Sequence, residues 1–303
     1  MENQPGVPVP VAKCYYSQQG GRRGRKRILP VPDEGEMSQN IIRSLVNAAE
    51  IAILIYVIVG AIRLLKTDRC PVSVIFFTIG VMSYMMSLLY WLVFEYMMPP
   101  DVRMPFAANE IGESAAFLLF ATSIKASVTE SSGRRFRFYA RGTAVAAVFT
   151  AANVCLWIAW SGEYMQDIVG GTALGYLVVI AANAARNVSI FSTRTAAVFA
   201  CIWLTVFLEV VRLFAPAGSY LLIDTAANLI RILTICYGVF AAARSIRGND
   251  PGMRAYIVSA SCFLWCTFAM YMCVEPMYFF PNIVSIMTIQ MMMLSLRKAV
   301  NER

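Results

Sequence analysis

The chain has 303 residues, of which 58% are hydrophobic and only 15% are charged, and its net charge is +8. A soluble domain is about one quarter charged, so this composition excludes an ordinary soluble protein and indicates a membrane protein. The absence of histidine excludes a Ser-His-Asp triad and an H-E-x-x-H zinc site, and the sequence has no glycine-rich phosphate loop. We therefore expect no enzyme activity, no cofactor and no metal centre.

Residues 1–40 differ from the rest of the chain. They are polar, contain several prolines and glycines, and include a basic cluster at 22–27 without an adjacent apolar run. This pattern predicts a disordered tail rather than a signal peptide.

From residue 41 to residue 298, apolar runs of about 20 residues, the length that crosses a bilayer core, alternate with short polar loops. The runs are continuously apolar, which favours helices over barrel strands. We therefore predict an all-α fold with one transmembrane helical domain over 41–298 and a short tail at 299–303. Nine spans are expected, arranged as one helix followed by four helical hairpins: 41–63, 72–98, 106–127, 138–160, 168–186, 195–214, 221–243, 255–274 and 279–297.

The fifth predicted span has a face of small residues. Gly171 and Gly175 are four positions apart, and several alanines follow at 181–185. Small residues allow two membrane helices to approach closely, so this face is expected to pack against a neighbouring helix.

The loops between the predicted spans differ in charge. Every second loop and the C-terminus are rich in lysine and arginine, whereas the alternate loops contain only Arg103. The positive-inside rule then predicts a plasma-membrane protein with a cytoplasmic C-terminus and an outside N-terminus. It also accounts for the positive charge without a nucleic-acid partner.

The basic cluster at 22–27 conflicts with an outside N-terminus, because it would have to cross the membrane. Three explanations are open. The cluster can lie too far from the first span to govern orientation, the run at 41–63 can fail to cross and leave eight spans, or translation can start at Met37.

Arg231 is the most informative single residue, because it lies near the middle of the seventh predicted span. A charged group at that depth costs about 2.5–3.5 kcal/mol on insertion scales. Asp224 and Asn228 share its helical stripe at spacings of seven and three residues. We expect this stripe to face other polar groups inside the bundle.

Other predicted spans supply candidate partners for Arg231. They are Glu209 and Arg212 in the sixth span, Glu110 and Glu113 in the third, Glu50 in the first and Gln290 in the ninth. We expect these groups to converge on a polar cavity in the outer half of the bundle, with Arg231 neutralised by Glu113 or Glu209. The alternative is that they form interhelical ion pairs that bind no ligand. Acidic groups at the outer ends outnumber the two arginines and favour a cationic ligand: Glu95, Glu110, Glu113, Glu209, Asp224 and Glu275.

Three functions fit this sequence. The first is a carrier for a small polar or cationic solute, bound around the charged groups. The second is a sensory module that binds a ligand and signals through a separate partner on its basic cytoplasmic loops. The third is a structural scaffold subunit whose only surroundings are the lipid bilayer and other membrane chains, with no ligand.

Overall fold

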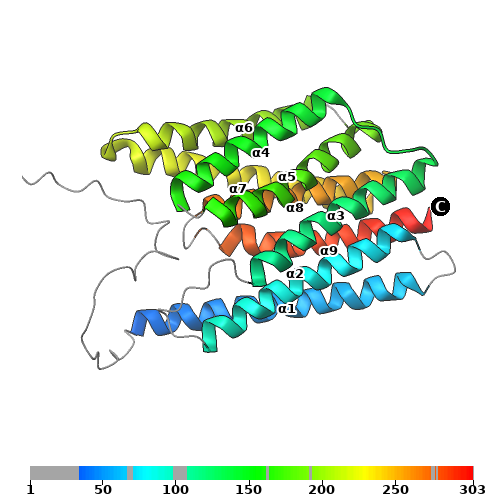
Figure 1. The fold of residues 1–303 in the computed structure, drawn as a ribbon, viewed down its shortest axis with the longest axis horizontal. Coiled ribbons are helices and arrows are strands. Elements are labelled where there is room, and N and C mark those ends of the chain that lie inside the picture. Colours follow the sequence, from blue (N-terminus) through cyan, green and yellow to red (C-terminus); the bar gives the residue numbers. More distant parts are fainter. Residues whose placement is uncertain are drawn as a thin grey trace, which may run out of the picture.

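The computed structural model describes residues 34–66, 71–97, 108–161, 164–190, 193–273, 277 and 279–302. Within these residues the chain forms nine helices and no strand, and every helix is long and apolar enough to cross a membrane. The predicted multi-pass helical bundle is confirmed. The helices lie side by side along one common direction (Figure 1): α1 (Glu34–Leu65), α2 (Val72–Met97), α3 (Ala108–Ser132), α4 (Ala140–Ser161), α5 (Tyr164–Asn187), α6 (Thr193–Phe214), α7 (Ala217–Arg247), α8 (Gly252–Met272) and α9 (Phe279–Asn301).

Several helices extend beyond the spans that hydropathy predicts, and α1 and α7 are examples. α1 begins at Glu34, within the segment 1–40 that the sequence predicts to be a disordered tail, and residues 1–33 lie outside the described part of the chain. α7 runs from Ala217 to Arg247 instead of 221–243. An apolar run marks only the part of a helix that lies in hydrocarbon, and polar turns can continue the same helix beyond the membrane.

Proline and glycine mark several helix ends. Pro216 and Pro251 directly precede α7 and α8, where the missing amide hydrogen of proline is not needed. Gly248 directly follows α7, and its amide donates to the carbonyl of Arg244 at 2.8 Å. The Lys298 ammonium of α9 donates to the Gly248 carbonyl at 2.7 Å, so α9 also satisfies the end of α7.

Helix α8 forms the centre of the bundle. In its span 83% of the residues are buried, compared with 22% in α1 and α6, which lie at opposite edges of the bundle (Figure 1). α8 packs against α3, α5, α7 and α9. The consecutive pairs α2–α3, α4–α5, α6–α7 and α8–α9 are also in contact, which confirms the predicted hairpins.

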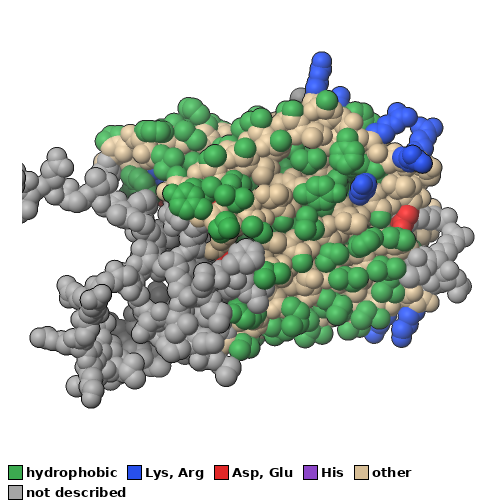
Figure 2. Space-filling view, in the orientation of Figure 1, with side chains coloured by type: hydrophobic (Ala, Val, Ile, Leu, Met, Phe, Trp, Pro, Cys, Tyr) green, Lys and Arg blue, Asp and Glu red, His purple; other side chains and the backbone are tan. Residues whose placement is uncertain are grey.

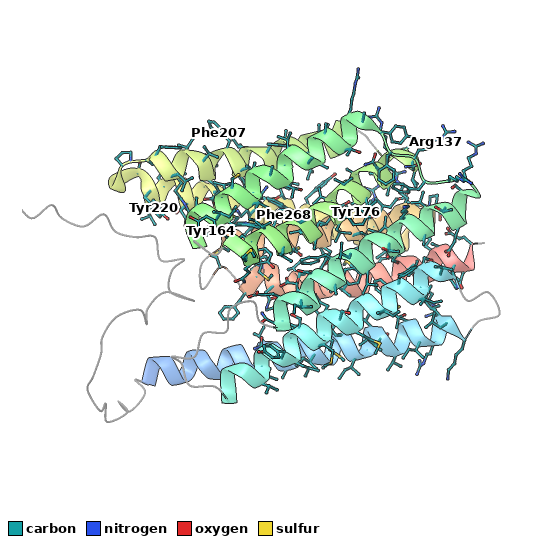
Figure 3. The ribbon with its side chains drawn as sticks, viewed as in Figure 1. Arg137, Tyr164, Tyr176, Phe207, Tyr220 and Phe268 are labelled. Atoms are coloured by element: carbon teal, nitrogen blue, oxygen red, sulfur yellow. The ribbon has the colours of Figure 1, made fainter. Side chains whose placement is uncertain are left out.

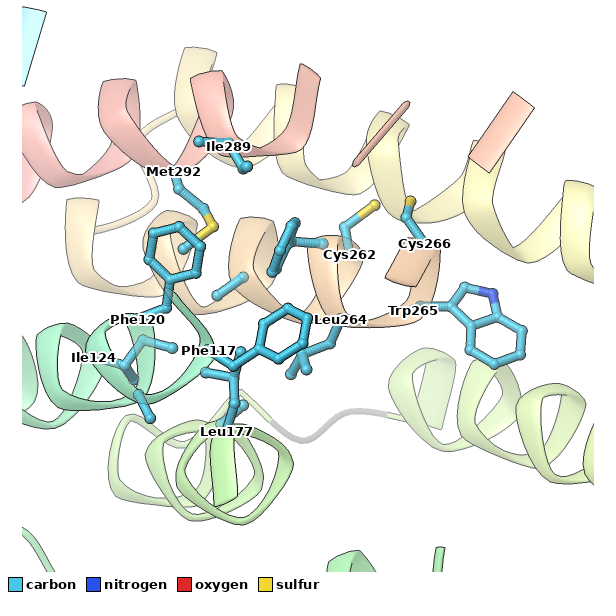
Figure 4. Packing of buried hydrophobic residues seen from close by; sticks show 14 of the residues in the cluster. Phe117, Phe120, Ile124, Leu177, Cys262, Leu264, Trp265, Cys266, Ile289 and Met292 are labelled. Carbon is cyan, nitrogen blue, oxygen red and sulfur yellow. The ribbon is translucent and has the colours of Figure 1, made fainter. Parts of the chain in front are cut away.

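Aromatic side chains of α3 and α8 fill the space around this centre. The rings of Phe120 and Phe263 meet edge to face with centroids 5.5 Å apart, and Phe117 packs against Phe263 at 6.3 Å. Ile289 and Met292 of α9 close the same cluster from the other side (Figure 4). Such interlocking apolar contacts hold α8 in a fixed position.

The predicted small-residue face of α5 is confirmed as a close helix contact. A Cβ atom added at Gly175 would lie 2.5 Å from Cγ2 of Thr150 in α4, and one at Gly171 would overlap Val154 of the same helix. The two glycines therefore let α4 and α5 approach more closely than alanine would allow.

Basic side chains gather at one end of the bundle (Figure 2). This end, called the basic face below, is where α1, α5, α7 and α9 finish, and their last turns contain Arg63, Arg186, Arg244, Arg247 and Lys298. Hydrophobic side chains are spread over the flank seen in Figure 2, and the exposed hydrophobic residues of the bundle include Ile55, Leu118 and Phe207. This distribution is typical of an integral membrane protein.

Candidate functional site

The α6–α7 hairpin brings four charged side chains together inside the bundle. Arg231 of α7 donates through Nη2 to Oε1 of Glu209 in α6, and Arg212 of α6 donates through Nη1 to Oδ1 of Asp224 in α7. The two halves are joined, because Nε of Arg212 lies 3.1 Å from Oε2 of Glu209. Two arginines and two carboxylates make this network neutral.

Asn228 completes the network. Its Oδ1 accepts from Nη1 of Arg231 at 2.7 Å, and its Nδ2 donates to Oδ2 of Asp224 at 3.1 Å. Arg231 is 2% exposed and Glu209 is 1% exposed. Charge-assisted hydrogen bonds to ionised partners are the strong ones, and they offset the cost of holding an arginine at this depth. The predicted stripe of Asp224, Asn228 and Arg231 is therefore confirmed as a single hydrogen-bonded unit.

Two further side chains touch this network and were not predicted from the sequence. The guanidinium carbon of Arg212 lies 5.0 Å from the ring centroid of Tyr220, a cation–π contact. The Cys273 thiol lies 3.7 Å from Oδ1 of Asn228. Tyr220 precedes Asp224 by four residues on the same helix, which was a usable signal in the sequence. Tyr220 lies at the end of the bundle opposite to Arg137 of the basic face (Figure 3), so the network occupies the half away from that face.

A small cavity adjoins the Glu209–Arg231 pair. Its volume is about 10 Å³, and residues of α4, α6, α7 and α8 line it: Asn153, Thr205, Val206, Glu209, Arg231, Trp265, Phe268 and Met272. A space of that size holds roughly one water molecule. The wide chamber predicted beside Arg231 is therefore absent from the part of the chain that the structure describes, because three bulky side chains of α8 fill the space.

The prediction that Arg231 pairs with Glu113 or Glu209 is resolved in favour of Glu209. Glu113 of α3 instead forms a hydrogen bond with Tyr271 of α8 and lies near Glu110. α7 packs against α6, α8 and α9, so the acid nearest to Arg231 comes from α6.

The remaining predicted residues lie away from the network. Glu50 of α1 is 2% exposed and accepts from Nδ2 of Asn282 in α9 at 2.6 Å, so it joins α1 to α9. Gln290 is half-buried in the middle of α9. The full convergence of predicted site residues is thus wrong for Glu50, Glu110, Glu113 and Gln290. Glu275 lies outside the described residues, as does the side chain of Glu95.

No protein-family model, no curated protein and no solved structure matches this chain. The chemistry of the site therefore has to be read from its own geometry. A neutral network of paired charges can exchange partners, because a cation arriving at Glu209 can replace Arg231 there. The same network can instead be a fixed structural contact that holds α6 and α7 together.

Proposed function

We propose that this integral membrane protein is a carrier for a small polar or cationic solute, with its basic face in the cytoplasm. The observation that supports the proposal is the neutral network of Glu209, Arg212, Asp224 and Arg231 in the interior of the bundle. Charged groups at this depth are costly, and in membrane proteins they commonly mark substrate or ion sites. The adjoining cavity adds the polar side chains of Asn153 and Thr205.

The cavity volume means that this arrangement is a closed one. A solute larger than water needs the α6–α7 hairpin to move away from α8, where Trp265 and Met272 now fill the space. α6 is suited to such a motion, because only 22% of its span is buried. In the opened state Glu209 would bind the solute cation, while Arg231 would keep its bond to Asn228.

The test is uptake into liposomes that contain the purified protein. Radiolabelled choline, putrescine and glycine serve as cationic and zwitterionic probes. We expect at least one probe to enter faster than into protein-free liposomes, and Glu209→Gln and Arg231→Gln to lower that rate at least tenfold. Arg254→Gln is the matched control, since Arg254 pairs with Asp250 at 3.4 Å on the surface, where both are about 40% exposed. Uptake that is absent for all three probes, or unchanged in both network variants, would overturn the proposal.

A second candidate function, a structural subunit that binds no ligand, is favoured by a different observation. All four charges have partners within the network, and the neighbouring cavity holds roughly one water. Buried ion pairs can often be replaced by apolar residues without loss of stability. A chain with Glu209→Gln/Arg231→Met, which replaces the whole pair, that is at least as thermally stable as the unmodified chain and leaves cell growth unchanged would support this function over the carrier.

A further inference from the structure

The segment that joins α3 to α4 is an ordered extended strap, residues 133–139. It starts at Gly133, whose φ of 63° reverses the chain direction directly after α3. Two asparagines of α5 then fix its backbone. Asn187 donates to the Arg137 carbonyl at 2.9 Å and accepts from the Arg137 amide at 3.4 Å, and Asn183 accepts from the Tyr139 amide at 2.7 Å.

The strap presents a dense set of arginines on the basic face. Arg134, Arg135 and Arg137 belong to it, Arg141 follows in the first turn of α4, and all four are exposed. Arg137 extends from the end of the bundle (Figure 3). Among the described residues, no carboxylate lies within ion-pair distance of these four side chains. Their charge is therefore available to an external anion.

Aromatic side chains alternate with these arginines. Phe136 and Phe138 meet edge to face at 5.2 Å, and Phe138 is 53% exposed. The Lys125 ammonium of α3 lies 5.7 Å from the Phe138 ring centroid. A mixed set of cations and exposed aromatic rings suits the boundary between headgroups and acyl chains.

Lys125 also lines a groove that runs along the flank of the bundle between α2 and α3. The groove has a volume of about 390 Å³ and is lined by Val72, Thr122, Lys125, Ala126, Thr129 and Glu130. The groove faces the region that the bilayer occupies, since both helices are membrane spans.

The polar atoms of the groove are mostly bonded within the protein. The hydroxyls of Thr122 and Thr129 donate to carbonyls of their own helix at 2.8 and 2.9 Å. The Glu130 carboxylate accepts from the amide and hydroxyl of Ser73 at 3.2 and 2.7 Å. What remains is a largely apolar groove with the Lys125 ammonium midway along it and the bonded Glu130 carboxylate toward the end of α3.

We propose that the strap and this groove together bind an anionic phospholipid of the leaflet at the basic face. The phosphate lies among Lys125 and the strap arginines, and an acyl chain lies in the groove. Basic pockets between transmembrane helices are suited to anionic headgroups, and arginine is suited to phosphate because its planar fork donates two parallel hydrogen bonds. The site lies at the other end of the bundle from the charge network and is independent of any transport activity.

The test compares lipid binding to the purified full chain by native mass spectrometry, with phosphatidylglycerol and phosphatidylcholine as probes. We expect phosphatidylglycerol to bind at least about tenfold more tightly than phosphatidylcholine. The triple variant Lys125→Gln/Arg135→Gln/Arg137→Gln should lose that preference, since each basic residue near an anionic surface contributes about a fivefold change in affinity. The matched control Arg244→Gln/Arg247→Gln/Arg297→Gln removes the same charge from exposed positions of the basic face and should retain the preference.

A second variant tests whether the lipid preference depends on the positive charge of the strap or on its folded structure. Arg135→Lys/Arg137→Lys keeps the charge and should keep most of the preference for phosphatidylglycerol. Equal affinity for the two lipids in the unmodified chain, or equal loss in the test and control triples, overturns the proposal. If the strap triple loses affinity for a soluble polyglutamate peptide but keeps its lipid preference, the strap is a protein-docking surface and the lipid proposal is also overturned.

Discussion

The stability of the charge network depends on which residue is removed, because its members neutralise one another in pairs. In Arg231→Met the Glu209 carboxylate stays buried, and Arg212 is the one cation of the network that remains. Arg212 is also paired with Asp224, so a single cation then faces two carboxylates. Breaking a buried pair from one side costs about 3–5 kcal/mol. We expect a correspondingly large fall in Tm for this variant, measured by thermal unfolding in detergent.

The double variant Glu209→Gln/Arg231→Met should recover most of that loss. It removes one charge of each sign and leaves Arg212 paired with Asp224, so the network stays neutral. Arg254→Gln, at an exposed pair, should change stability by less than about 1 kcal/mol. A double variant that is no more stable than Arg231→Met alone would show that charge pairing does not govern this site.

The identity of the partner of Arg231 shows what the sequence can and cannot predict for single residues. The spacing of Asp224, Asn228 and Arg231 correctly placed them on one stripe. The choice between Glu209 and Glu113 depends on which helix packs against α7, and spacing within one helix contains no information on that. The closure of the cavity by Trp265 and Phe268 was also unpredictable, because aromatic residues in a packed core and around an open chamber give the same apolar pattern.

At the scale of whole helices, the close packing of α4 against α5 depends on Gly171. Gly170, its neighbour in the chain, provides a matched control. A methyl group at Gly171 overlaps Val154, whose β-branched side chain has little freedom to move, whereas nothing lies within 4 Å of a methyl group at Gly170. Gly171→Ala is expected to cost about 1–3 kcal/mol through overpacking. Gly170→Ala is expected to be neutral or to stabilise the chain by up to about 1 kcal/mol, because alanine favours a helix.

Thermal unfolding of the two variants in the same detergent measures this difference. Equal Tm values for Gly171→Ala and Gly170→Ala would contradict the close approach of α4 and α5. The small-residue face itself was predictable from the four-residue glycine spacing. Its partner helix was not, since any neighbour of α5 could have supplied the complementary surface.

The order of the strap depends on side chains of a different helix. Asn187→Ala removes the two hydrogen bonds to the backbone of Arg137. We expect faster hydrogen exchange of the strap amides in this variant, because an amide that loses its partner opens more readily. Thr172→Ala, which removes a hydroxyl bonded only within α5, is the control and should leave strap exchange unchanged.

At the scale of the whole molecule, run length and charge distribution were sufficient to predict the architecture. Within the residues that the structure describes, the nine apolar runs form nine helices and consecutive runs form hairpins, because in hydrocarbon every backbone amide must be satisfied within its own helix. The polar extensions of α1 and α7 were not predictable, since hydropathy identifies only the apolar part of a helix. It contains no information on polar turns that continue the helix beyond the membrane. The placement of α8 at the centre was also not predictable from composition: its mean span hydropathy of 1.5 equals that of α9, although the two differ in burial.

We predict the orientation of the bundle from its basic face, where α9 and the strap present their arginines and lysines. Positive loops are retained on the cytoplasmic side, so this face should lie inside the cell. A green fluorescent protein fused after residue 303 should fluoresce in a bacterial host, because it folds in the cytoplasm, and alkaline phosphatase fused there should be inactive. Alkaline phosphatase inserted after Ala215, in the turn between α6 and α7 at the opposite face, should be active. The reverse pattern would place the charge network in the cytoplasmic half, and a solute would then reach Glu209 from inside the cell.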